Sequence, residues 1–219
     1  MKVKYFLVAL LGLLLFVAPA QASPVILDFN MNASHPSGAS ISFTPGGCLV
    51  GENIGVDYVQ DLSGTYTDYS IAGAVLSFNT GTLTSSTSNT WNFGGGGSIV
   101  VQGVGTDSLI HKWLEGSFSS ARVEIEGGIF KVVIASFIDK KDKDLLAHFG
   151  LPDDTEFTGY MNLSFLATGT PPGGFTSITV GSGDIINISS TGEVPIPPTV
   201  WLLGAGLVGL VGLRRKFRK

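Results

Sequence analysis

Residues 121–138, ARVEIEGGIFKVVIASFI, decide the fold of this chain. Polar and apolar side chains alternate from Arg122 to Glu126, which is the period of a half-buried β-strand. The dipeptide Gly127-Gly128 is typical of a tight turn between two strands, and the apolar run Ile129–Ile138 follows it. The stretch therefore predicts a β-hairpin.

The same kind of pattern continues through the middle of the chain, where short apolar runs lie between clusters of Gly, Ser, Thr and Asn. The other runs are Val25–Phe29, Ala39–Phe43, Gly55–Val59, Ile71–Phe78, Ser98–Val104, Leu109–Phe118, Thr158–Ala167, Phe175–Val180 and Ile185–Ser190. In one of them Met161, Leu163 and Phe165 share a face, opposite Asn162 and Ser164. About ten or eleven strands with short turns predict an all-β domain, a two-sheet sandwich or jelly-roll-like fold.

One short helix is expected between strands, over residues 139–149. Asp139 is a good N-cap, and Leu145, Leu146 and Phe149 have the spacing of one helical face. Gly150 and Pro152 then end the helix.

The N-terminus has the three parts of a secretory signal peptide. Two lysines stand within the first four residues, an apolar run extends from Tyr5 to Ala18, and Ala20-Gln21-Ala22 forms a small-residue cleavage site. We expect export through the Sec translocon and cleavage by signal peptidase before Ser23, which makes residues 1–22 a processing segment. An uncleaved N-terminal anchor is the alternative.

The C-terminal residues 194–219, VPIPPTVWLLGAGLVGLVGLRRKFRK, have three different parts. The prolines keep the first part extended. The apolar run Val200–Leu213 spans roughly 21 Å as a helix, which is short for a hydrocarbon core of about 30 Å. Five cations follow and favour a cytoplasmic end, namely Arg214, Arg215, Lys216, Arg218 and Lys219. These features predict a marginal transmembrane helix, used either transiently or as a permanent single-pass anchor.

This tail resembles the PEP-CTERM sorting signal of Gram-negative bacteria. The sorting motif is Val194-Pro195-Ile196-Pro197, with isoleucine in place of the usual glutamate, and the Trp201-Leu202 pair follows it. The resemblance implies that an exosortase recognises and removes the tail after transient insertion in the inner membrane. It also implies delivery of the protein to the cell surface or an exopolysaccharide matrix.

The remaining segment, residues 23–193, has the length of a single domain. It contains all 17 acidic side chains of the protein but only six of its 13 Lys and Arg residues. This acidic excess argues against nucleic-acid binding. Cys48 is the single cysteine, so neither an intramolecular disulfide nor a cysteine-based metal cluster can form, and we expect a plain buried or half-buried thiol.

No residue pattern in this segment specifies an active site, a cofactor or a metal. The histidines His35, His111 and His148 form no local pair with metal-ligand spacing, and no Gly-x-Ser-x-Gly sequence is present. Gly94–Gly97 precedes a predicted strand rather than a helix, which indicates a hairpin or bulge instead of a phosphate-binding loop.

Two groups of acidic residues have patterns that suggest a site. Asp139, Asp142 and Asp144 resemble a calcium loop, but they alternate with lysines and lack the glycine and terminal glutamate that such a loop needs, so a solvated helix start is expected. The carboxylates Glu52, Asp57 and Asp61 could serve a glycosidase, although nothing in the sequence fixes their separation.

The aromatic side chains have two interpretations. They could form a sugar-stacking platform, but we favour core packing for both Trp91 and Trp113, with Tyr66 or Tyr69 exposed.

The sequence as a whole predicts an exported surface or matrix protein with a structural or carbohydrate-binding β-domain. A secreted polysaccharide hydrolase and an anchored periplasmic protein are the alternatives.

Overall fold

The computed structural model describes residues 24–31, 38–64 and 66–190 of the chain. All of its strands lie within the unit Pro24–Thr191. The elements are β1 (Ile26–Met31), β2 (Ser40–Phe43), β3 (Cys48–Asp61), β4 (Tyr69–Ser86), β5 (Thr90–Phe93), β6 (Gly96–Val104), β7 (Ile110–Glu126), β8 (Ile129–Lys141), α2 (Lys143–His148), β9 (Phe157–Thr168) and β10 (Phe175–Ser189). The predicted all-β domain with one short helix is confirmed.

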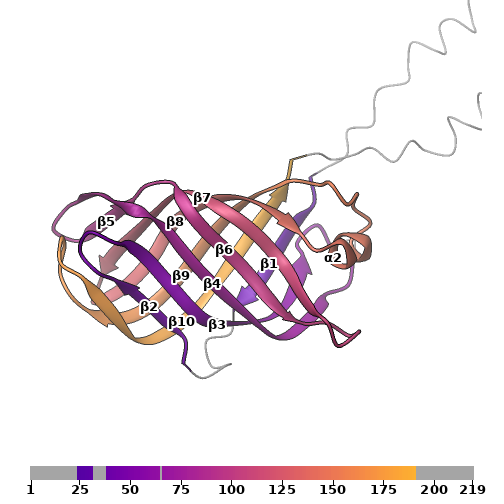
Figure 1. Cartoon of the computed structure of the whole chain (residues 1–219), viewed down its shortest axis with the longest axis horizontal. Helices are drawn as coiled ribbons and strands as arrows, with labels where there is room; N and C mark the ends of the chain where they lie inside the picture. The colour runs from indigo at the N-terminus through magenta and orange to yellow at the C-terminus, as the bar shows by residue number, and fades with distance from the viewer. Residues whose placement is uncertain (1–23, 32–37, 65, 191–219) are drawn as a thin grey trace, which may run out of the picture. The chain divides into compact units, whose positions relative to one another are not determined.

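The strands form one antiparallel sheet that closes on itself (Figure 1). β1 and β2 share one position, because β1 pairs with one half of β3 and of β10 while β2 pairs with the other half. β5 and β6 share another position between β4 and β7 in the same way. Antiparallel ladders link all other neighbours in chain order, and β1 on β10 closes the ring.

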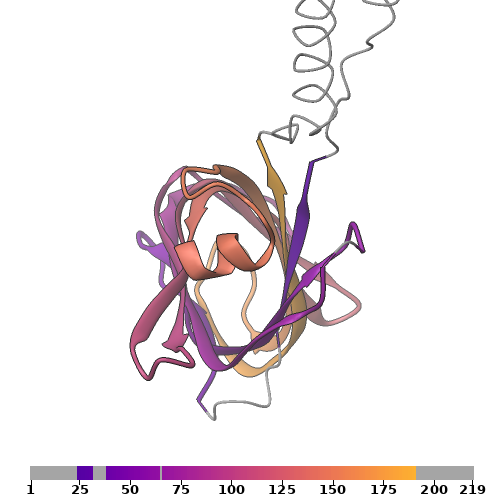
Figure 2. The ribbon, with the colours of Figure 1, turned by 90° about the vertical axis from the view of Figure 1, so that its right-hand side faces the viewer.

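The structure has one closed sheet where the sequence predicts two packed sheets. Hydrogen bonds join all ten strands into a single sheet, so opposite walls of that sheet take the place of the two layers. Because neighbours follow chain order, the chain meanders and does not cross between layers as in a jelly roll. Figure 2 shows the walls of the sheet surrounding an interior, with α2 across one end.

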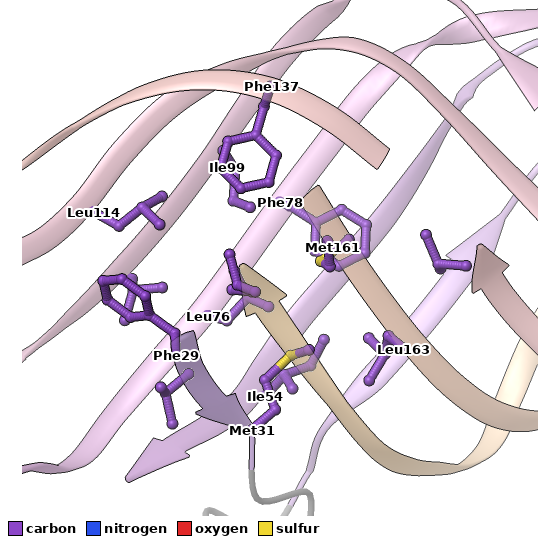
Figure 3. Packing of buried hydrophobic residues seen from close by; sticks show 14 of the residues in the cluster. Phe29, Met31, Ile54, Leu76, Phe78, Ile99, Leu114, Phe137, Met161 and Leu163 are labelled. Carbon is purple, nitrogen blue, oxygen red and sulfur yellow. The ribbon is translucent and has the colours of Figure 1, made fainter. Parts of the chain in front are cut away.

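Side chains fill the interior, as the alternation along each strand requires. On β9 the side chains of Met161, Leu163 and Phe165 are buried, as predicted from their spacing. Figure 3 shows Phe29, Phe78, Phe137 and Met161 among the inward residues. The large rings need small neighbours: a Cβ at Gly159 would lie 2.0 Å from the ring of Phe137.

The helix starts later than the sequence predicted. Asp139 and Lys141 belong to β8 and are buried, whereas Asp142 is the N-cap of α2 and its carboxylate accepts from the backbone N–H of Asp144 at 2.8 Å. Leu145 and Leu146 are buried as expected. The assignment of Asp139 to a solvated helix start is therefore wrong, because strand pairing with Gly116 and Phe157 extends β8 past it.

Candidate functional site

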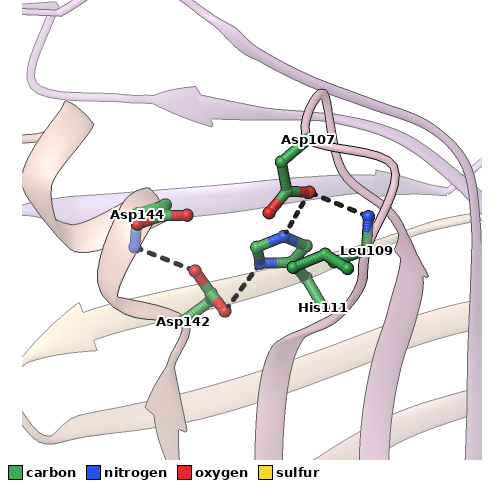
Figure 4. Close-up of polar contacts among 5 residues, drawn as sticks. All are labelled: Asp107, Leu109, His111, Asp142 and Asp144. Atoms are coloured by element: carbon green, nitrogen blue, oxygen red, sulfur yellow. Dashed lines mark hydrogen bonds and ion pairs between the residues drawn. The ribbon is translucent and has the colours of Figure 1, made fainter.

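An ionic network surrounds His111 where β7 begins beside α2 (Figure 4). Its Nε2 lies 2.9 Å from Oδ1 of Asp107 in the β6–β7 turn, and its Nδ1 lies 3.0 Å from Oδ2 of Asp142. An imidazole that faces an acceptor at both nitrogens is best satisfied when it carries both protons. The hydrogen bonds to Asp107 and Asp142 accordingly raise the pKa of His111.

Aromatic rings support this histidine from inside. The imidazole stacks on Trp113 with ring centres 4.6 Å apart and planes 7° apart, and Trp113 is itself buried. Tyr69 contacts the edge of Trp113 and the ring of His148, whose Nε2 bonds the carbonyl oxygen of Thr67 at 2.9 Å. The network therefore packs on the aromatic end of the core.

His111, Asp142 and Asp144 bring donor atoms within 4.8 Å of one another. One imidazole and two carboxylates are donors that divalent transition metals accept. Both ring nitrogens of His111 are, however, already engaged by carboxylates, and Asp142 also caps α2. Ion pairing and helix capping thus account for this cluster.

A small pocket of about 180 Å³ opens next to the network. It is lined by Tyr69, Ser70, Ile71, Val104, Gly105, Thr106 and Trp113. The adjoining β6–β7 hairpin exposes three aliphatic side chains, Val104, Leu109 and Ile110. The pocket is too small for more than a fragment of a ligand, since ligand sites usually measure about 300 Å³ or more.

A larger groove of about 460 Å³ runs over the outer face of β3, β4 and β6. Its lining residues are Val50, Gly51, Glu52, Asn53, Ser77, Phe78, Asn79, Ser98 and Val100. A bulge in β3 forms part of it, and Asn53 there has a φ of 55°. The Oδ1 of Asn79 accepts from the backbone N–H of Ser98 at 2.6 Å, which fixes the amide and leaves its nitrogen directed elsewhere.

The chemistry of this groove is polar with aliphatic patches. Glu52 and Asn53 are exposed hydrogen-bonding groups, and Val50 and Val100 add apolar surface. Such a surface can form hydrogen bonds to a ligand rich in hydroxyl groups.

The structure does not bring the three predicted carboxylates together into one site. Glu52 lines the groove, whereas Asp61 is buried and accepts hydrogen bonds from the hydroxyl of Ser63 at 2.5 Å and the backbone N–H of Tyr66 at 3.1 Å. The carboxylate of Asp61 therefore stabilises the turn after β3. Asp57 is half-buried between them on the same strand.

Several predictions about single residues are confirmed. Trp91 and Trp113 are both core residues, Tyr66 is exposed, and Cys48 is half-buried. The glycine run joins β5 to β6, and a Cβ at Gly95 would lie 2.9 Å from the carbonyl oxygen of Ser119. The run is thus a strand connection with close backbone contacts.

The processing signals and His35 lie outside the described residues. This applies to Ala20, Ala22 and Ser23 at the predicted cleavage site, to the sorting motif from Val194 to Pro197, and to the basic cluster Arg214, Arg215, Lys216, Arg218 and Lys219. Within the ranges that the structure describes, no helix has the length and apolarity needed to cross a membrane.

Comparison with known proteins gives no relative for this chain. No family model, no curated protein and no solved structure matches it.

Proposed function

We propose that this protein is an exported cell-surface or exopolysaccharide-matrix protein whose β-domain has a structural or carbohydrate-binding role. The sorting part of this proposal rests on the sequence of the two ends. The signal peptide of residues 1–22 would engage the Sec translocon and signal peptidase. The tail of residues 194–219 would sit transiently in the inner membrane until an exosortase removes it.

The groove over β3, β4 and β6 is the observation that carries the binding role. Its volume of about 460 Å³ lies in the usual range for ligand sites. Glu52, Asn53 and Ser98 offer hydrogen-bonding groups beside aliphatic surface, which suits the hydroxyls and C–H faces of a polysaccharide. The acidic excess of the domain favours a neutral or cationic polymer over an anionic one and speaks against nucleic acid.

The groove supports binding better than hydrolysis. Most glycosidases use two carboxylates that flank the scissile bond. Glu52 is the only carboxylate among the residues that line this groove in the described part of the chain. Polysaccharide hydrolysis is therefore the second candidate function, and it rests on the carboxylate of Glu52 alone.

A binding experiment tests the groove directly. We expect neutral matrix polysaccharide to bind the purified protein without release of reducing sugar, and E52Q to weaken binding several-fold by removing a charged acceptor. N162A, on the exposed outer face of β9, is the matched control and should bind like the parent protein. Equal affinity of E52Q and the parent would contradict the assignment of the groove.

Peptide mass spectrometry of surface-extracted protein tests the sorting proposal separately. We expect mature material that lacks Trp201–Leu213. Surface material that still ends at Lys219 would contradict removal of the tail, whereas intact protein found in the inner-membrane fraction alone would support the alternative of a permanently anchored periplasmic protein.

A further inference from the structure

Three polar side chains meet inside the closed sheet, among buried aromatic side chains. Asp139 and Lys141 lie on β8, Asn187 lies on β10, and none of the three side chains reaches solvent. The Nζ of Lys141 contacts Oδ2 of Asp139 and donates to Oδ1 of Asn187 at 2.9 Å. The other carboxylate oxygen of Asp139 is buried and has no hydrogen-bond partner among the described residues.

Aromatic rings seal this group from water. The Nζ of Lys141 lies 4.4 Å from the ring centre of Phe157 and 5.3 Å from that of Phe29. Burial lowers the pKa of Lys141 well below its usual range, because charge is poorly solvated there. A buried ion pair with an unsatisfied carboxylate oxygen is costly, whereas a neutral amine beside a neutral carboxylic acid avoids the separated charges.

We propose that Lys141 and Asn187 form an intramolecular isopeptide bond, with Asp139 as the group that transfers the proton. The amine of Lys141 attacks Cγ of Asn187, so that an Nζ–Cγ bond forms and the Cγ–Nδ2 bond breaks. The proton lost by Nζ passes through the carboxyl group of Asp139 to Nδ2, which leaves as ammonia. One amide replaces another, and the reaction needs no oxidant, reductant or further reactant.

The structure holds the amide of Asn187 next to the amine of Lys141. Its Nδ2 donates to the carbonyl oxygen of Ile185 at 3.1 Å, which turns Oδ1 toward Lys141. Asp139 is two residues from Lys141 on the same strand face, so its carboxyl group stays next to the amine without a conformational change. Proximity and a water-free site supply the conditions in which an amine reacts with an amide carbonyl.

The bond would join two strands that are not neighbours. β9 lies between β8 and β10, with Phe157 opposite Asp139 and Gly159 opposite Asn187. The crosslink therefore spans β9 on the inner face of the sheet and encloses α2 and β9 in a covalent loop.

The intact mass of the folded, purified full chain, measured after denaturation, tests the proposal. We expect a mass lower than the sequence mass by one ammonia, and a branched proteolytic peptide that contains Lys141 and Asn187. A mass equal to the sequence mass overturns the proposal. Loss of one water with a Lys141–Asp139 link overturns the choice of Asn187 as acceptor.

Variants assign the roles of the three residues. K141M, N187A and D139N should each retain the full mass, while K140M, at the exposed neighbouring position, should still lose ammonia completely. Circular dichroism shows which variants are folded, and the mass of the parent protein decides the proposal even if one variant does not fold. A folded D139N protein that loses ammonia as fast as the parent overturns proton transfer through Asp139.

Discussion

At the residue scale, Asp28 on β1 is a carboxylate held in unfavourable surroundings. Its Oδ1 is buried and has no hydrogen-bond partner among the described residues. Burial and the nearby charge of Asp184 together raise the pKa of Asp28 to about 6. Above that pH the folded protein must hold a charge that the unfolded chain solvates better.

We therefore expect D28N to stabilise the protein at pH 8, by on the order of 1 kcal/mol after allowance for partial exposure. A raised carboxyl pKa means that the parent protein gains stability as pH falls from about 6 toward 3.8, so the advantage of D28N should disappear over that window. Urea unfolding at pH 8 and pH 4 measures the difference. D153N, at an exposed position, is the control, and a D28N effect that does not depend on pH would contradict this account.

His111 has the opposite dependence on pH. Its pKa is raised by Asp107 and Asp142, so its ion pairs stabilise the fold fully below pH 6.5 and are lost as pH rises through the raised value. We expect H111Q to lower the melting temperature more at pH 5 than at pH 9.

H148Q is the matched control for this histidine. The Nε2 of His148 faces the neutral carbonyl oxygen of Thr67 rather than a carboxylate. An equal pH dependence for both variants would argue against the His111 network.

The contacts of single residues were the least predictable part of this protein. His111 and Asp142 are separated by 31 positions, and nothing in either local sequence indicates that they meet. The burial of Lys141 could not be predicted either, because alternating Lys and Asp residues are usually solvated. The pairing of β8 with β7 and β9 determines where Lys141 and Asp142 lie, and this pairing cannot be read from the local sequence.

At the element scale, α2 covers one end of the sheet interior. Leu145, Leu146 and Phe149 are completely buried although the helix has only six residues. A helix this short is stable only through such packing.

We expect L146A to destabilise the protein by about 2–5 kcal/mol, because it leaves a cavity under the helix. K143A, at an exposed position in the same helix, should change stability by no more than about 0.5 kcal/mol. Chemical denaturation measures both values. A small effect of L146A would show that the end of the core tolerates loss of this contact.

Elements were predictable where a local pattern is strong. The hairpin around Gly127-Gly128 appears as expected, with β7 and β8 paired from Glu126 and Ile129 onward. Alternation alone does not mark where a strand ends, so β8 continues three residues past Ile138 and shortens the expected helix.

At the scale of the whole domain, β1 closes one half of the sheet, and β2 closes the other half. β1 completes the ladders along the C-terminal half of β10 and the C-terminal half of β3. Without it, both strands would present open edges, which are templates for association with other chains.

We expect removal of residues 24–31 to produce association that size-exclusion chromatography detects, and a synthetic peptide of residues 24–31 to restore the monodisperse form by strand addition. A scrambled peptide of the same composition is the control. A truncated chain that remains monodisperse alone would show that the open edges are protected in another way.

Closure itself could not be predicted from the sequence. Each strand signal is local, whereas the pairing of Ile26 with Ile188 joins opposite ends of the domain. A meander that closes and two packed sheets share the same alternation of side chains, so only the long-range ladders distinguish them.

The pairing of β1 with β10 also decides how the domain responds to tension. Val25 and Ser189 exchange hydrogen bonds, so the chain enters and leaves the domain side by side. A stretching force applied through these two points would break the hydrogen bonds between β1 and β10 one pair after another, starting at Val25 and Ser189, instead of loading all pairs at the same time. The first barrier to extension should therefore be low, and β1 would still hold its ladder to β3 after the ladder to β10 has opened.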